Sequence, residues 1–430
     1  MKKASVITLG CSKNLVDSEQ LLYRLEQNGY EIEHNGSFDN KDVVLVNTCG
    51  FIQDAKQESI DIILDLIEAK KAGNIKDLRV FGCLSERYKE ELKKEIPDID
   101  KYYGTYELEK IYKDLRLKPS KISNNQRVLT GAKHYAYVKI SDGCDRTCSF
   151  CAIPIIKGKH KSRPLESIVA ECRYLAHNGV KEIILIAQDL SYYGLDLKEK
   201  HLLVELLESI SKIEGIEWIR MHYLYPSYFP FEVLQLMKDN PKVCKYIDLA
   251  LQHISDNQLN LMRRNISKEQ TLELIRTIKQ EIPDVALRTT MLIGHPGETE
   301  QDFEELIEFM DEVKFDRLGG FTYSAEENTF ADEKYENDVP EDIKQQRFDT
   351  MMEHQQNISN QNNQLKIGKI YKVVIDKEDE EYYIGRTQFD SPEVDNEVLI
   401  EKQAKLKIGE FYNIKINSSD DFDLYGELAK

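Results

Sequence analysis

Residues 135–151 read YAYVKISDGCDRTCSFC, a strand-like run followed at once by three closely spaced cysteines. Cys144, Cys148 and Cys151 form a C-x3-C-x2-C array. Thiolates are soft ligands that suit an iron-sulfur cluster or zinc. Three ligands for a four-iron cube leave one iron open, and an open iron can chelate the amino and carboxylate groups of S-adenosylmethionine. A zinc knuckle is the alternative, with His160 available as a fourth ligand.

Five more strand-like runs follow the array, with amphipathic helical stretches between them. The six predicted strands are Tyr135–Ile140, Glu182–Ala187, Glu217–Tyr223, Tyr246–Leu251, Val285–Leu292 and Asp316–Thr322. Alternation of strand and helix predicts an α/β fold with parallel strands, and six units predict an open, partial (β/α)6 version of the TIM-like barrel. Barrel enzymes carry their chemistry at the C-terminal ends of the strands, which is where the array stands.

Three polar or small residues at other strand ends are candidate cofactor contacts. Gln188 ends the second predicted strand, Gln252 ends the fourth, and Gly294 follows the fifth. A small residue such as Gly294 lets a cofactor approach the backbone. Ordinary loop glutamines and an ordinary strand-to-helix turn remain the alternatives. Beyond the cluster ligands, the sequence singles out no catalytic side chain.

A second set of cysteines stands in the first third of the chain. Cys11, Cys49 and Cys83 are separated by 38 and 34 residues. Each directly follows a predicted strand, at residues 6–10, 42–48 and 78–82. The C-terminal ends of parallel strands share one edge of a sheet, so we expect the three thiols to converge and to bind a second cluster. Its open iron could hold an exogenous sulfur species. Three unrelated core cysteines are the alternative.

The pattern of elements predicts three domains. Residues 1–125 alternate strand and helix and predict a parallel-sheet α/β domain. The partial barrel occupies residues 130–365, and the polar stretch 118–127 before it reads as a linker. In residues 366–430 short alternating strands replace helices, which predicts a small antiparallel β-barrel.

Composition narrows the class of protein. The 430 residues carry a formal net charge of -18, which argues against a surface devoted to nucleic acid. The sequence shows no signal-peptide pattern and no long apolar run, so we expect a cytoplasmic protein with no membrane contact. Eight cysteines in a reducing compartment favour metal chemistry over disulfides. Cys172 and Cys244, outside both sets, read as small buried hydrophobes.

Several stretches match a known family in order. They are LGCSKNLVDSE from Leu9, NTCGFI from Asn47, GCLSERY from Gly82, the array from Ser141, AQDLSYYG from Ala187, LALQHISDNQLNLMRR from Leu249, RTTMLIGHPGETEQDF from Arg288 and YIGRTQFDSPEVDNEV from Tyr383. On these stretches the chain resembles the radical S-adenosylmethionine methylthiotransferases, in the branch that modifies an aspartate of small-subunit ribosomal protein S-twelve. It departs at Ser12 and His295, where the family often has Pro and Phe.

The resemblance implies a function. Two 4Fe-4S clusters, one on each cysteine set, and S-adenosylmethionine would serve the insertion of sulfur and a methyl group at the aspartate β-carbon. A carbon-hydrogen bond that is no acid demands a radical, and the cofactor supplies it. The resemblance also implies a TRAM-like C-terminal barrel that binds the substrate, a basic ribosomal protein as partner, free or in the ribosomal particle, and a flavodoxin- or ferredoxin-type electron donor.

Two other functions stay open at this point. One is methylthiolation of a modified adenosine beside the anticodon of transfer RNA, and the other is a non-enzymatic electron-transfer module with two metal sites. Residues 366–430 hold 15 Asp or Glu against 10 Lys or Arg, a net charge of -5. A barrel that binds RNA should be basic, whereas an acidic barrel suits a basic protein. We therefore expect no direct nucleic-acid specificity.

Overall fold

The structure is a computed structural model that describes residues 1–119, 126–198, 200–402 and 405–429. It forms two compact units, which are described separately. Unit 1 comprises Met1–Gly131, Tyr137–Arg146 and Ala152–Tyr174, and unit 2 comprises Ala132–Ala136, Thr147–Cys151 and Leu175–Lys430. Residues 120–125 of the predicted linker lie outside the described residues, and the division into three domains stays a prediction.

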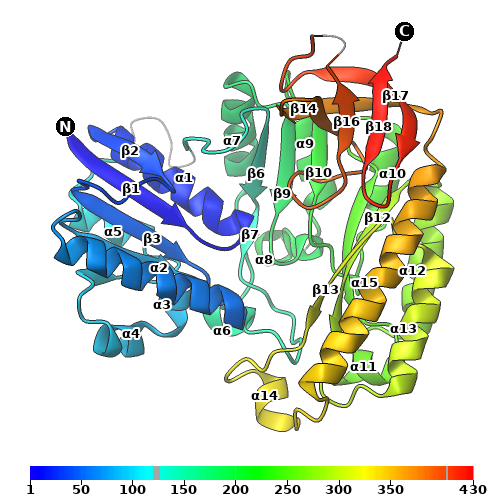
Figure 1. The fold of residues 1–430 in the computed structure, drawn as a ribbon, viewed down its shortest axis with the longest axis horizontal. Helices are drawn as coiled ribbons and strands as arrows, with labels where there is room; N and C mark the ends of the chain where they lie inside the picture. The colour runs from blue at the N-terminus through cyan, green and yellow to red at the C-terminus, as the bar shows by residue number, and fades with distance from the viewer. Residues whose placement is uncertain (120–125, 199, 403–404, 430) are drawn as a thin grey trace. The chain divides into compact units, whose positions relative to one another are not determined.

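Unit 1 is built on a five-stranded sheet with the strand order β2-β1-β3-β4-β5 (Figure 1). Its strands are β1 (Lys2–Thr8), β2 (Tyr30–His34), β3 (Val43–Thr48), β4 (Leu78–Gly82) and β5 (Lys101–Tyr102). Every neighbouring pair runs parallel. This confirms the predicted parallel α/β sheet, and β2 and β5 extend it at its two edges.

Helices cover both faces of this sheet. They are α1 (Ser12–Glu26), α2 (Gln53–Lys71), α3 (Cys83–Arg87), α4 (Lys89–Glu95) and α5 (Leu108–Asp114). Side chains of β3 alternate between the faces: Val43 and Leu45 share a core with α1, and Val44 and Val46 share a core with α2. A strand buried on both faces is apolar throughout, which explains why β3 shows no polar alternation.

Unit 1 also holds four elements from the region around the cysteine array. They are β7 (Ser141–Asp142), α6 (Ile153–Lys157), β8 (Lys161–Ser162) and most of α7 (Leu165–His177). A buried ion network joins them to the sheet domain, because Arg127 pairs with both Glu19 and Glu171, and Arg163 also pairs with Glu171.

Unit 2 contains parallel strands in two arcs, of order β10-β9-β6 and β11-β12-β13. The strands are β6 (Tyr135–Lys139), whose first residues belong to this unit, β9 (Glu182–Ile186), β10 (Trp218–Met221), β11 (Tyr246–Gln252), β12 (Ala286–Ile293) and β13 (Arg317–Thr322). Isolated parallel bridges at Ile219–Val243 and Leu224–Leu249 link β10 to the second arc. The predicted partial barrel of six strands is confirmed.

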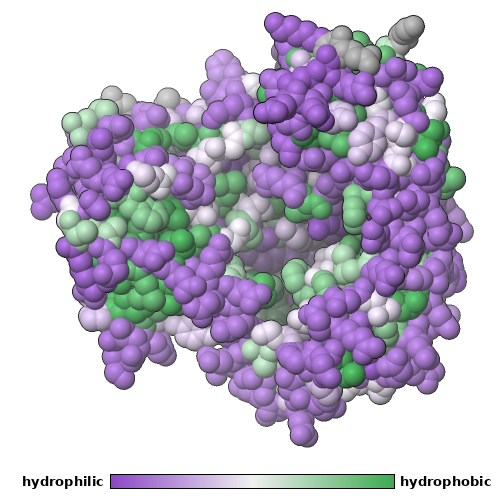
Figure 2. Space-filling view, viewed as in Figure 1, coloured by the Kyte–Doolittle hydropathy of each residue, from purple (hydrophilic) through white to green (hydrophobic). Residues whose placement is uncertain are grey.

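Helices lie between these strands and cover the arcs (Figure 1). They are η1 (Leu190–Tyr192), α8 (Leu195–Lys198), α9 (Leu203–Ser211), α10 (Glu232–Asp239), α11 (Asp256–Leu261), α12 (Lys268–Glu281), α13 (Glu300–Val313), α14 (Phe330–Lys334) and α15 (Glu341–Gln364). Ser267 and Thr299 begin α12 and α13 with reciprocal capping boxes, which satisfy backbone N–H groups at both helix starts. Figure 2 shows mostly hydrophilic side chains over α15. None of the helices in the described part of the chain combines the length and apolar character that crossing a membrane requires.

The C-terminal residues of unit 2 close into a five-stranded barrel of order β14-β15-β16-β18-β17. Its strands are β14 (Ile370–Glu378), β15 (Tyr382–Thr387), β16 (Val398–Glu401), β17 (Phe411–Ser419) and β18 (Leu424–Leu428). The small barrel was predicted as antiparallel, and four of its ladders are. The pair β16–β18 runs parallel, which corrects that detail. Pairing between segments so far apart in the chain leaves no trace in local alternation.

This small barrel packs on the N-terminal ends of the unit 2 strands. Trp218 and Ala286, the first residues of β10 and β12, share an apolar core with Val374 of β14. Buried ion pairs reinforce the contact, since Glu182 at the start of β9 binds Arg220 and also Arg386 of β15. The C-terminal ends of the strands, where barrel chemistry is expected, therefore remain clear of the small barrel.

Candidate functional site

The first cysteine set lies in unit 1, at the C-terminal edge of the sheet. Cys11 precedes α1, Cys49 follows β3, and Cys83 opens α3 directly after β4. The strands β1, β3 and β4 are neighbours in the sheet. At Gly10, whose φ is +85°, an added Cβ would lie 2.7 Å from the Cβ of Cys49. The backbone of the first loop thus touches the second cysteine, as the sequence predicts.

Asn14 ties the loops of this edge together. Its Nδ2 donates to the carbonyl of Leu9 at 2.9 Å and to that of Thr48 at 3.2 Å. The Cys83 thiol donates to Asn14 Oδ1 at 3.9 Å, a distance in keeping with a sulfur donor. One buried amide on the first turn of α1 therefore contacts the loops that carry all three cysteines, and this residue was not singled out from the sequence.

The electrostatics of these thiols suit a shared cationic centre. Burial raises the pKa of Cys49 and raises that of Cys83 to about 12, and the charges of neighbouring cysteine thiolates raise both further, while Lys157 lowers the pKa of Cys83. Three thiolates in mutual range repel one another unless a metal centre compensates their charge. The donor set and its crowding therefore fit an iron-sulfur cluster. Within the described ranges, no group of three or more His, Cys, Asp or Glu side chains is placed to hold a single metal ion.

The second cysteine set has one member in unit 1 and two members in unit 2. Cys144 belongs to unit 1, where its N–H donates to Gly158 O at 3.1 Å and its Sγ accepts from Arg146 N at 3.4 Å. His160, the fourth ligand of the zinc alternative, forms a 3.0 Å hydrogen bond between its Nε2 and Ser162 Oγ. One ring nitrogen of that histidine is thus already engaged.

Cys148 and Cys151 belong to unit 2, and Ser149 between them anchors their loop. The Ser149 N–H donates to Met262 O at 3.1 Å, and its carbonyl accepts from Ala331 N at 2.7 Å. Its hydroxyl lies 3.0 Å from Nε2 of His295. Ser149 and His295 are both fully buried. The loop is therefore tied to three separate segments, which follow β11, β12 and β13 in the chain.

His295 has a defined hydrogen-bonding role in this anchor. Its Nδ1 lies 3.1 Å from Gln258 Oε1, an acceptor, so Nδ1 carries the proton and Nε2 accepts from the Ser149 hydroxyl. Burial lowers the pKa of His295 to about 4, which keeps the ring neutral. The ring also meets Tyr323 and Phe150 edge to face. His295 stands where the family often has Phe, and it therefore adds a hydrogen bond to the cysteine loop that a phenylalanine could not form.

Two further side chains contact the Cys148 sulfur. Arg264 Nη1 donates to Sγ at 3.0 Å, and the hydroxyl oxygen of Tyr225 lies 3.6 Å from it. Both side chains are buried. Sequence reasoning missed them, although Arg264 stands in the quoted stretch LALQHISDNQLNLMRR.

The structure treats the three predicted cofactor contacts differently. Gln188 keeps a buried Oε1 that has no hydrogen-bond partner among the residues described. Gln252 ends β11 at a register shift with φ +75°, a strained conformation of the kind that clusters at functional sites. An added Cβ on Gly294 would lie 2.2 Å from Lys344 Cγ, so the lysine stem of α15 already fills the space beside this glycine. Cofactor binding by the three residues stays a prediction.

A buried polar group lies beside Gly294. Glu298 accepts from Gly294 N at 2.8 Å and pairs with Arg347 at 2.8 Å, and its Oε2 lies 3.7 Å from Nε2 of His253. Burial raises the pKa of Glu298 to about 7 and lowers that of His253 to about 3. The Nε2 of His253 finds no hydrogen-bond partner in the described part of the chain. A buried polar atom of this kind calls for a partner, such as an ordered water or a ligand.

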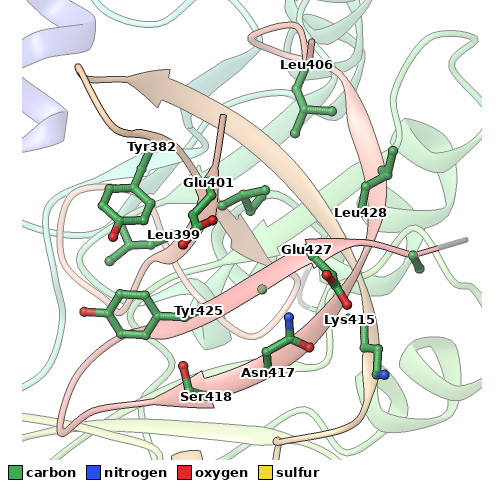
Figure 3. Close-up of a pocket in the computed structure, with 13 residues that line it drawn as sticks. Tyr382, Leu399, Glu401, Leu406, Lys415, Asn417, Ser418, Tyr425, Glu427 and Leu428 are labelled. Atoms are coloured by element: carbon green, nitrogen blue, oxygen red, sulfur yellow. The ribbon is translucent and has the colours of Figure 1, made fainter. Parts of the chain in front are cut away.

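A groove of about 660 Å³ lies on the C-terminal barrel, along β16, β17 and β18 (Figure 3). The rings of Tyr382 and Tyr425 stack edge to face at one end, with centroids 6.4 Å apart. Glu427 and Lys415 lie together away from the tyrosines, as Figure 3 shows. None of the candidate cluster ligands is among the residues that line this groove.

Comparison with known proteins decides the family. A protein of Bacteroides fragilis named ribosomal protein uS12 methylthiotransferase RimO is 54% identical, with 99% of both chains covered. A protein of the same name from Cytophaga hutchinsonii is 52% identical over 100% of this chain and 98% of its own. The chain belongs to the uS12 methylthiotransferase family. The resemblance stated from the sequence motifs is thereby confirmed.

Three regions of this methylthiotransferase-family chain match separate domain families. Residues 3–104 match the uncharacterized protein family UPF0004, residues 138–310 match the Radical SAM superfamily, and residues 367–429 match the TRAM domain. Among solved structures, the radical S-adenosylmethionine methyltransferase TsrM from Kitasatospora setae has a TM-score of 0.55 at 15% identity and covers 77% of each chain. The cobalamin-dependent radical enzyme OxsB has a TM-score of 0.52 at 13% identity, covering 77% of this chain and 54% of its own. At these identities the likeness shows the fold alone.

Proposed function

We propose that this chain is a methylthiotransferase that inserts sulfur and a methyl group at the β-carbon of an aspartate of ribosomal protein uS12. The observation that carries the proposal is the full-length identity of 54% to a relative named for that activity. Both cysteine sets are present in the chain, at the ends of the strands where the fold presents them. The proposal therefore accounts for two sets of three cysteines in one chain, of which a single-cluster enzyme would need one.

The proposed cofactors are two 4Fe-4S clusters and S-adenosylmethionine. Cys11, Cys49 and Cys83 would hold one cluster, and the array would hold the other. When bound to the reduced array cluster, S-adenosylmethionine supplies the radical that removes a hydrogen atom from carbon. Ser149 fixes the array loop, and the buried Gln188 Oε1 and His253 Nε2, which have no hydrogen-bond partner among the described residues, are available to a bound ligand.

The cluster assignment is tested by iron content and cofactor cleavage. Anaerobic reconstitution should yield about eight irons per chain, and about four after either cysteine set is replaced by alanine. Loss of the array should abolish reductive cleavage of S-adenosylmethionine. Loss of Cys11, Cys49 and Cys83 should leave cleavage intact while product receives no sulfur. Full iron content without the array, or equal loss of cleavage in both folded variants, would contradict the assignment.

The proposed partner is the basic surface of uS12, recruited by the acidic C-terminal barrel. The barrel packs on the N-terminal ends of the strands, away from the expected reaction end, so it serves recruitment instead of forming the reaction pocket. The acidic run Glu378–Glu381 is exposed. The second run has a structural role as well, because Asp421 accepts from Gln356 and Asn360 of α15 and Asp420 accepts backbone N–H groups of its own turn.

The recruitment test therefore uses the first run alone. Reversal of the exposed Glu380 and Glu381 to lysine should raise KM for the ribosomal substrate at low salt. Loss of weak attractions worth about 1 to 2 kcal/mol in total corresponds to a factor of about 5 to 30. The effect should shrink above about 0.15 M salt, where the Debye length is about 8 Å. The value of kcat should stay unchanged, since neither residue approaches a cysteine.

The matched control is a second double variant, in which two exposed glutamates elsewhere in unit 2 are reversed to lysine so that the change in net charge is the same. Glu304 and Glu308 are exposed on α13, and their reversal to lysine should leave KM unchanged. An equal rise of KM in the control, or none in the double variant of the first run, would contradict recruitment through the barrel. Methylthiolation of transfer RNA in place of uS12 by the native protein would overturn the substrate.

The remaining parts of the proposal follow from the chemistry. Each turnover consumes electrons, which a flavodoxin- or ferredoxin-type donor would supply to the array cluster. A ribosomal substrate would be encountered in the cytoplasm, which supports a cytoplasmic location for the enzyme. Each of the three predicted domains would then have one role: residues 1–125 would deliver sulfur, residues 130–365 would generate the radical and residues 366–430 would recruit the substrate.

A further inference from the structure

Arg264 is a buried cation that pairs with no carboxylate in the described part of the chain. Its side chain is 3% exposed, and no Asp or Glu in the described residues forms an ion pair with it. A buried charge is costly unless it is paired or hydrogen bonded. The group that meets its Nη1 is the sulfur of Cys148, at 3.0 Å. The sulfur of Cys148 is therefore the group to which the guanidinium donates directly, and Cys151 also lies within its electrostatic range.

The position of this guanidinium is determined by its surroundings. It lies over the ring of Tyr225, with 4.0 Å between the Arg264 Cζ and the ring centroid. Its Nη2 donates to the carbonyl oxygen of Ala250 in β11. The Tyr225 hydroxyl in turn donates to the Arg264 carbonyl at 3.1 Å. Stacking and two hydrogen bonds thus orient Nη1 toward Cys148 before any cluster binds.

We propose that Arg264 is a positioning residue that raises the reduction potential of the array cluster through Cys148. The inference rests on the proposed function, because it requires a cluster on that thiolate. One-electron reduction by an external reductant adds a negative charge to the cluster and its sulfur ligands. A fixed cation and an N–H donor on a ligand sulfur stabilise the more negative state. Arg264 thereby makes it easier for the donor to reduce the cluster.

The test measures the midpoint potential of the array cluster in isolation. In the full chain with Cys11, Cys49 and Cys83 replaced by alanine, dithionite titration followed by electron paramagnetic resonance reports this cluster alone. Arg264→Met removes the charge and the donor but keeps an unbranched chain. We expect a reduction equilibrium at least tenfold less favourable, which for a one-electron couple is a shift of about 59 mV to lower potential.

The matched control is the neighbouring arginine. Arg263 lies over the ring of Phe330, 4.4 Å from its centroid, and within the described ranges it forms no hydrogen bond with a cysteine. Arg263→Met removes the same charge one residue away, so its potential should stay at the parent value. A potential in Arg264→Met equal to that in Arg263→Met, at full iron content, would overturn the proposal. A shift of equal size in both variants would also overturn it, because any nearby positive charge would then explain the potential without the contact to Cys148.

Two milder variants decide the matter if Arg264→Met does not bind a cluster. Arg264→Lys keeps the charge but cannot contact Ala250 and Cys148 together in the geometry of the planar fork, and Tyr225→Phe removes the hydroxyl while keeping the ring. In both variants the reduction equilibrium should become less favourable by a factor below ten, and the electron paramagnetic resonance spectrum of the cluster should change. Unchanged potential in both would refute the role of Arg264. Absence of iron from the parent triple variant would instead refute the cluster assignment itself.

Discussion

Removal of one buried carboxylate should destabilise unit 2 far more than removal of an exposed one at the same contact. Glu182 is 1% exposed and pairs with Arg220 Nε at 2.8 Å and with Arg386 at 2.5 Å. The two arginine side chains are 0% and 2% exposed. Glu182→Gln keeps the shape of the side chain and removes its charge. Arg386 then retains Asp376, whereas Arg220 keeps no carboxylate within ion-pair distance in the described residues.

The magnitude follows from that burial. Breaking a buried ion pair by removing one partner costs about 3 to 5 kcal/mol, because a charge stays buried without compensation. Glu217 offers the comparison, since it pairs with Lys372 of β14 at 2.8 Å while the two side chains are 47% and 45% exposed. Exposed pairs contribute about 0.2 to 1 kcal/mol. Glu217→Gln should therefore cost at most about 1 kcal/mol.

The assay is thermal unfolding followed by circular dichroism, with both variants and the parent at low and high salt. At about 2 °C per kcal/mol for a unit of this size, Glu182→Gln should lower Tm by roughly 6 to 10 °C and Glu217→Gln by no more than about 2 °C. Salt should erase the smaller effect and leave the larger one, since buried pairs are poorly screened. Equal shifts in the two variants would refute the view that the buried network holds the small barrel in place.

Two further changes test the cysteine loops. Gly10→Ala should lower the iron content of the first cluster, because the new Cβ meets Cys49 at 2.7 Å, whereas Gly29→Ala, with a similar φ of +81° and no atom within 4 Å, should keep it; equal iron content measured in both variants would count against the crowding. His295→Phe should make the free energy of unfolding less dependent on pH below pH 6.5. Burial holds the pKa of His295 at about 4, below its ordinary value near 6.5, so the stability it contributes is present above pH 6.5 and is lost as the pH falls toward 4. Denaturant unfolding should show that the free energy of unfolding falls between pH 7 and pH 5 by roughly 2 kcal/mol less in His295→Phe than in the parent. An equal fall in the two proteins would contradict a neutral buried ring.

Local pattern was sufficient for most of the fold and for placing the cysteines that we propose as cluster ligands at the ends of strands. The strands that precede Cys11, Cys49 and Cys83 are apolar runs bounded by helical stretches, and their ends could be located to within a residue or two. The edge strand β2 was missed because its residues, Tyr30–His34, are half polar, and β5 because it has only two residues. Weak local signals of this kind do not distinguish a short edge strand from a loop.

Contacts between distant segments could not be read from the chain. Arg264 and Cys148 are separated by 116 positions, and Asn14 meets a cysteine 69 positions away. The parallel pair β16–β18 depends on barrel closure, and the structural role of Asp421 depends on where α15 lies. Each of these contacts depends on how whole helices and strands pack together, and the local periodicity of the sequence carries no information about that packing.

The sequence by itself determined which residues are candidate metal ligands and which strand ends carry them, because ligand chemistry belongs to the residue and strand alternation is local. It also determined the acidic character of the C-terminal barrel. Only the tertiary structure decided what surrounds those ligands: the arginine on Cys148, the histidine on Ser149 and the carboxylate network beneath the barrel. The physical reason is that burial and charge compensation are properties of packed neighbours, and neighbours in space are chosen by the fold as a whole.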